Sequence, residues 1–167
     1  MSVEVLDESG SDVAVDLAAL AGLARFVLDR MRLHPGTEMC VRLVDEPTIE
    51  TLNRQWMQAD GATDVLAFPI DELTPGRVGE DPPEGYLGDL ALCPQVAAQQ
   101  APDHQHAPGD EIDLLCVHGI LHLLGYDHAD PDQHQEMFGL QTRLLAEWQG
   151  VRAGQPLSEP APADGPA

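Results

Sequence analysis

Three histidines stand close together in the stretch HGILHLLGYDH, at positions 118, 122 and 128. His118 and His122 are four residues apart, and helical residues at that spacing lie on one face, about 5–6 Å apart at Cβ. Gly125 is suited to ending the helix, because glycine adopts the left-handed conformation that follows many helices. A short turn then brings His128 back toward the other two. The spacing predicts three nitrogen ligands around one metal ion, with a further coordination position open as in catalytic zinc sites.

The alternative is that these are ordinary core or surface histidines. The predicted helix is apolar nearly all round, and burying several imidazoles there without partners costs roughly 1–3 kcal/mol each. A shared ion satisfies all three rings, which favours the metal site. Because three neutral imidazoles suit Zn²⁺ better than Mg²⁺, which prefers oxygen ligands, we expect one Zn²⁺ per chain.

The residues next to the histidines bear on the type of reaction. In zinc peptidases with an H-E-x-x-H motif, the residue after the first histidine is the glutamate that acts as base. Here that residue is Gly119, so a peptidase is disfavoured. We place Asp127 among the candidate catalytic residues, as a carboxylate that orients a ligand histidine through its other ring nitrogen. The alternative for Asp127 is a solvated carboxylate at the helix end.

Strand and helix patterns alternate along the chain. Apolar periodicity predicts strands at 3–7, 37–44, 64–70 and 86–93, and helices at 16–33, 46–57, 94–101, 110–124 and 131–149. The polar break at 102–109 predicts that His104 and His106 are solvated loop residues rather than ligands. This order indicates an α/β (α+β) fold with a single domain, in which a small four- or five-stranded mixed sheet packs with helices.

The composition limits the partners. The 167 residues include 29 acidic and 8 basic side chains, for a formal net charge of -21, and every basic residue is an arginine. A negative charge of this size repels polyanions, so we expect no DNA partner and only local contact with RNA. Apolar runs fall far short of the ~20 residues that cross a bilayer, and the first residues do not resemble a signal peptide. We therefore expect a cytoplasmic protein with no membrane partner.

The motif HGILHLLGYDH resembles the H-G-x-L-H-L-x-G-Y-D-H signature of YbeY-type bacterial endoribonucleases. The stretches LNRQWMQADGATDVLAFP and LGDLALCP are similar to two further segments of that family. The resemblance covers residues 1–150. The remaining segment, 151–167, is an acidic tail rich in Pro and Ala that we expect to be disordered.

The resemblance implies a metal-dependent endoribonuclease specific for single strands, acting in 3′-end maturation of small-subunit (16S) ribosomal RNA and in ribosome quality control. It implies zinc ligation by His118, His122 and His128. The implied partners are ribosomal RNA and the small ribosomal subunit or one of its proteins.

Two positions depart from the family pattern. Many members carry an arginine directly after the aromatic residue of the second segment, where this chain has Met57, and the usual serine of LSFP is Ala67. Arginine is a natural clamp for phosphate. Arg54 lies three residues before Met57 on the same helix face, so it is our candidate catalytic replacement. The alternative for Arg54 is an exposed surface arginine.

Two other functions compete with the nuclease. One is a ribosome-assembly factor that binds metal and a ribosomal protein but cleaves little RNA, which the acidic charge and the lost arginine favour. The other is a metal-dependent hydrolase of a small substrate, because three histidines do not encode specificity.

Overall fold

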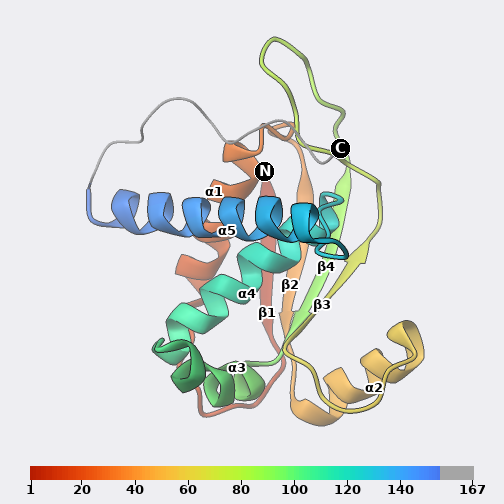
Figure 1. Cartoon of the computed structure of the whole chain (residues 1–167), viewed down its shortest axis with the longest axis vertical. Helices are drawn as coiled ribbons and strands as arrows, with labels where there is room; N and C mark the ends of the chain where they lie inside the picture. Colours follow the sequence, from red (N-terminus) through yellow and green to blue (C-terminus); the bar gives the residue numbers. More distant parts are fainter. Residues whose placement is uncertain (155–167) are drawn as a thin grey trace.

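The computed structural model describes residues 1–154 of the chain (Figure 1). Within these residues, four strands and five α-helices form a layered α+β domain. The strands are β1 (Ser2–Asp7), β2 (Glu38–Leu43), β3 (Val65–Pro69) and β4 (Tyr86–Leu92). The helices are α1 (Leu17–Arg30), α2 (Glu46–Met57), α3 (Pro94–Gln100), α4 (Pro108–Leu123) and α5 (Pro131–Arg152), with a 3-10 helix at Ala101–His104.

The strands form one mixed sheet in the order β1-β2-β4-β3. Strands β1, β2 and β4 run parallel, whereas β3 pairs antiparallel with β4 at the edge of the sheet. The predicted fold class, a small mixed sheet packed with helices, is therefore confirmed, with four strands in the described part of the chain.

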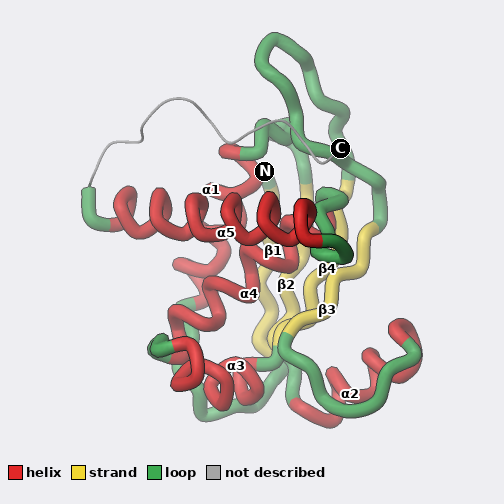
Figure 2. Tube along the Cα trace, viewed as in Figure 1, coloured by secondary structure: helices red, strands yellow, loops and turns green. Residues whose placement is uncertain are grey.

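The main core lies between one face of the sheet and helices α1 and α4, and α5 crosses over these two helices as an outer layer (Figures 1 and 2). Fully buried side chains such as Val27 of α1, Val41 of β2 and Ile120 of α4 form this core. Asp16 is the N-cap of α1, where its carboxylate accepts a hydrogen bond from the Ala19 N–H at 3.0 Å.

Helix α2 covers only one end of the opposite face of the sheet (Figure 1). Its Ile49 is fully buried against that end, in a second, smaller cluster. Trp56 of the same helix is 66% exposed. The reason is that the last turn of α2 extends past the cluster, where Trp56 meets the ring of Phe68 edge-on at a centroid distance of 6.4 Å.

The C-terminal helix continues further than the sequence pattern indicated. α5 runs to Arg152, two residues into the segment expected to be a tail. Residues 155–167 lie outside the described part of the chain, so the disorder expected for 151–167 stays a prediction. No helix within residues 1–154 is long and apolar enough to cross a membrane.

Candidate metal centre and its cleft

Helix α4 places the first two histidines. His118 and His122 lie on one face of its C-terminal half, and the helix ends at Leu123. Gly125 follows with φ 98°, the left-handed conformation that the sequence predicted. The N–H of Tyr126 then donates to the carbonyl of Leu121 at 3.0 Å, which turns the chain back along the helix. This reversal carries the next residues, including the third histidine, toward the side chains of α4.

The packing of α4 on the sheet fixes where these imidazoles lie. A Cβ added at Gly119 would sit 2.7 Å from Cδ2 of Leu90 in β4 and 3.3 Å from Cγ2 of Val65 in β3. Glycine therefore lets the helix approach the sheet directly beside His118. Gly119, which stands where zinc peptidases have their glutamate, thus has a packing role.

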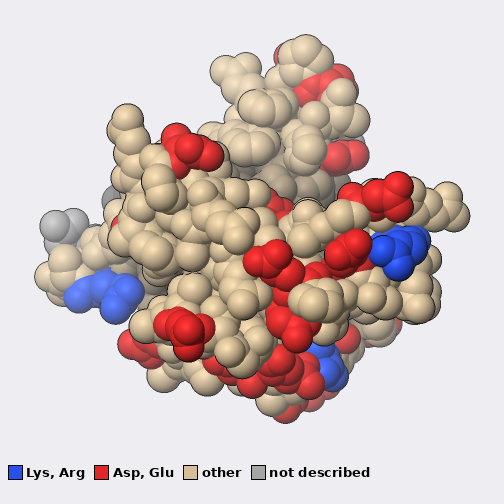
Figure 3. Space-filling view, turned by 90° about the horizontal axis from the view of Figure 1, so that it is seen from below, with Lys and Arg blue, Asp and Glu red and all other residues tan. Residues whose placement is uncertain are grey.

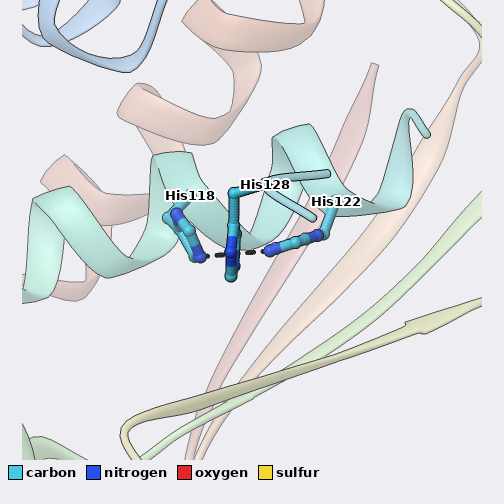
Figure 4. A group of neighbouring side chains, drawn as sticks. All are labelled: His118, His122 and His128. Atoms are coloured by element: carbon cyan, nitrogen blue, oxygen red, sulfur yellow. Dashed lines mark hydrogen bonds between the residues drawn. The ribbon is translucent and has the colours of Figure 1, made fainter. Parts of the chain in front are cut away.

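The structure brings the three predicted imidazoles together. One potential ligand atom from each of His118, His122 and His128 lies within 4.8 Å of the others. Nε2 of His122 is 3.1 Å from Nε2 of His118. In Figure 4 the rings of His118 and His122 point from α4 toward the ring of His128, which comes from the return loop. The chain thus presents three convergent nitrogens, as the spacing predicted.

Burial favours the neutral form of the helical pair. The pKa values of His118 and His122 are lowered from the ordinary value of 6.5, mainly because burial penalises a charged imidazole. A neutral imidazole leaves one ring nitrogen free to accept a proton or bind a metal. The two side chains are therefore ready to act as ligands near neutral pH.

Gln141 of α5 orients His118. Its Oε1 lies 2.9 Å from Nδ1 of His118, and the Gln141 side chain is only 4% exposed. An amide oxygen is an acceptor, so Nδ1 carries the hydrogen and Nε2 is left as the acceptor facing His122. Sequence reasoning missed Gln141. The available signal was a polar residue on the helix face that also carries Met137, Leu140 and Leu144.

Asp127 has a different contact from the one expected. Its Oδ1 accepts a hydrogen bond from the backbone N–H of His128 at 2.7 Å, and the side chain is exposed. The ring contact that the sequence assigned to Asp127 is made for His118 by Gln141. Asp127 therefore shapes the return loop, and its catalytic role stays a prediction.

Arg54 forms an exposed ion pair on α2. Its Nη2 lies 3.0 Å from Oε1 of Glu50, and its side chain is 59% exposed. The neighbouring Trp56 and Met57 line a hollow of about 530 Å³ together with Arg42. The contact with Glu50 matches the surface-arginine alternative, and a role for Arg54 in catalysis stays a prediction.

A cavity of about 230 Å³ adjoins the histidines. Its polar lining comes from the residue before β3, the 3-10 helix, α4, the return loop and α5. The polar residues are Asp64, His104, Glu111, His118, His128 and Gln141. The histidines thus face a space with several proton-accepting groups. The face of the molecule in Figure 3 carries many acidic side chains, with arginine only at isolated places.

A second group of ligand-type side chains was not expected. His104 and His106, predicted to be solvated, both contact Glu111, and one atom from each of the three lies within 4.8 Å of the others. The Glu111 carboxylate is fully buried. The sequence did carry a signal, because Glu111 precedes His118 by seven residues and so lies on the same face of α4.

Comparisons with known proteins agree with the motifs. The sequence profile of the family described as Endoribonuclease YbeY matches residues 6–149. An Endoribonuclease YbeY of Nocardioides sp. is 63% identical over 148 residues, which cover 89% of this chain and 98% of the relative. One from Thermobifida fusca is 57% identical over 148 residues, covering 89% of this chain and 94% of the relative. The solution structure of TM1509 from Thermotoga maritima aligns with a TM-score of 0.58 and 28% identity, over 95% of this chain and 97% of that one.

Proposed function

The chain belongs to the endoribonuclease YbeY family, and on that premise we propose that it is a metal-dependent endoribonuclease of single-stranded RNA. Its proposed role is 3′-end maturation of small-subunit (16S) ribosomal RNA and ribosome quality control in the cytoplasm. The proposed partners are this RNA and the small ribosomal subunit or one of its proteins. The observation that carries the proposal is the convergence of three imidazoles beside a cavity.

We propose that the metal is Zn²⁺, held by His118, His122 and His128. The donor set fits, because it consists of three imidazole nitrogens, which suit zinc better than Mg²⁺. A divalent ion at this position supplies Lewis acidity toward a phosphoryl oxygen.

The protein's own groups prepare this site for the ion and the substrate. Burial keeps His118 and His122 neutral, so a metal does not have to displace a proton from them near neutral pH. Gln141 holds the His118 ring so that Nε2 faces the other imidazoles. The adjoining cavity gives a phosphodiester a place beside the histidines. The proposed contributions of Arg54, as a phosphate clamp, and of Asp127, through the return loop, are secondary to these.

Cleavage of a labelled RNA tests the proposal. Full-length protein purified without chelator is incubated with a single-stranded RNA that spans the 3′ end of precursor 16S RNA, and with the same sequence as a duplex. We expect cleavage of the single strand, loss of cleavage on removal of the metal, and recovery when Zn²⁺ is returned. The His118→Ala variant serves as the inactive control.

The competing assembly-factor function predicts a different outcome in the same assay. A protein of that kind binds metal at the three histidines but leaves the RNA intact. Intact single-stranded RNA in the presence of bound zinc would therefore reject the nuclease proposal, and mapping of 16S RNA ends in cells lacking the protein would then test the assembly role.

A further inference from the structure

We propose that His104, His106 and Glu111 form a second binding site for a divalent transition-metal ion, separate from the histidine triad. These residues come from the 3-10 helix, the turn after it and the first turns of α4. Their side chains are joined by short contacts, share a buried carboxylate and remain partly open to solvent.

The local backbone aims both imidazoles at one carboxylate. The 3-10 helix ends at His104, and Gln105 then adopts a left-handed conformation with φ 59°. The N–H of His106 donates to the carbonyl of Ala101 at 2.9 Å, which closes the turn. The two histidines are therefore held on the same side of the turn, next to Glu111.

The distances between the side-chain atoms suit a common ion. Nδ1 of His104 lies 2.9 Å from Oε1 and 3.0 Å from Oε2 of Glu111, and Nδ1 of His106 lies 3.0 Å from Oε2. Ligands that are each about 2.0–2.2 Å from one zinc ion are separated by about 3–3.5 Å. A small outward movement of the imidazoles, which are 51% and 36% exposed, therefore makes room for the ion.

The charge at this position favours a cation. The Glu111 carboxylate is 0% exposed, and its ion pairs within the described residues are with these two imidazoles. Neutral imidazoles donate hydrogen bonds but bring no positive charge, and a buried carboxylate without a compensating cation is costly. The chain has no lysine, and within residues 1–154 no arginine forms an ion pair with Glu111.

The chemistry of the donor set indicates which ion the site would take. A donor set of two imidazoles and one carboxylate is typical of zinc and similar transition metals rather than of Ca²⁺ or Mg²⁺.

The location of the site suggests what the second ion does. His104 and Glu111 line the same cavity as His118 and His128. In a chain with a formal net charge of -21, a second cation in this cavity attracts an RNA phosphate. This consequence rests on the proposed nuclease function, whereas metal binding itself does not.

The test counts zinc ions on four full-length proteins at pH 7.5. They are the wild type, the triad variant His122→Ala, the second-site double variant His104→Ala/His106→Ala, and Asp103→Asn. The last is a control that removes an exposed negative charge beside His104 without removing a ligand. Each protein is stripped with chelator and titrated with Zn²⁺ against a chromophoric competitor, and circular dichroism confirms that it is folded.

We expect two zinc equivalents for the wild type and Asp103→Asn, and one for each of the other two variants. Glu111→Gln, which keeps the shape of the buried side chain, is expected to behave like the double variant. A double variant that retains the wild-type stoichiometry overturns the inference, as does a loss of one equivalent in Asp103→Asn. The experiment measures the number of bound zinc ions and not RNA cleavage. Its result therefore stands even if the proposed nuclease function is wrong.

Discussion

Oε1 of Gln141 lies 2.9 Å from Nδ1 of His118, and this contact joins helix α5 to the histidine group across 23 positions of sequence. The acceptor fixes which nitrogen of His118 carries its hydrogen. Gln141 is thus a positioning residue for the site, although it lies outside the histidine motif.

Replacing Gln141 with leucine is expected to weaken zinc binding by about 10–100-fold, the usual effect of losing such a support. The variant remains folded, because an apolar side chain suits this buried position. Zinc affinity measured by competition tests this. Gln135→Leu, at an exposed position of the same helix, is the matched control and is expected to bind zinc like the wild type.

His122→Ala is expected to remove most zinc from the triad and most RNA cleavage, while the fold persists through the surrounding leucines. Elemental analysis, cleavage assays and circular dichroism measure the three effects. His134→Ala is the control, because this exposed imidazole stacks on Phe138 at a centroid distance of 4.2 Å and lies outside the group of potential ligands. An unchanged zinc content in His122→Ala would contradict the assignment of His122 as a ligand.

The metal-free protein is expected to lose stability as the pH falls below neutrality. The pKa values of His118 and His122 are lowered in the folded state, so between the folded values and 6.5 the unfolded chain binds more protons. The free energy of unfolding therefore falls as the pH decreases from 6.5 through the folded pKa values. Urea unfolding at pH 7.5 and 5.5 measures the change.

The matched variant for this pH effect is His118→Gln/His122→Gln, which is expected to lose less stability over the same pH interval. The comparison is needed because the raised pKa of His104 changes the stability with pH in the opposite direction. Its contribution is present below pH 6.5 and is lost as the pH rises through its folded value. An identical pH dependence in both proteins would contradict the role assigned to the buried pair.

Gly119→Ala is expected to destabilise the protein by about 1–3 kcal/mol, because the added Cβ would lie 2.7 Å from Leu90 Cδ2. Moving α4 off the sheet also displaces His118, so zinc affinity falls as well. Gly139→Ala on α5 is the control, since a Cβ there has no heavy atom within 4 Å. The control is expected to raise stability by up to about 1 kcal/mol, through helix propensity. Urea unfolding compares the two.

Arg54→Ala tests the remaining candidate for a phosphate clamp. If the Arg54 guanidinium leaves Glu50 to contact RNA, Arg54→Ala is expected to cleave RNA at least about tenfold more slowly. This corresponds to a rise of about 1.4 kcal/mol in the activation free energy. The zinc content is expected to be unchanged. Adding Met57→Arg is then expected to restore part of the rate. Cleavage at the wild-type rate would show that Arg54 is a surface residue with no part in the reaction.

Local spacing in the sequence determined the convergence of the three histidines. The i, i+4 pair His118 and His122 and the left-handed Gly125 all appear as predicted. The physical reason is that helix geometry and the turn at its end depend on hydrogen bonds between residues a few positions apart. The alternation of strands and helices was predictable on the same basis.

Tertiary packing decided the surroundings of that group. The order of the strands, the contact of Gln141 with His118, the exposure of Trp56 and the burial of Glu111 beside two histidines each depend on segments that meet only in the folded chain. The sequence pattern marks a side chain as polar or apolar. Which other residues cover that side chain depends on how whole helices pack on the sheet. The spacing of residues along the chain does not determine this packing.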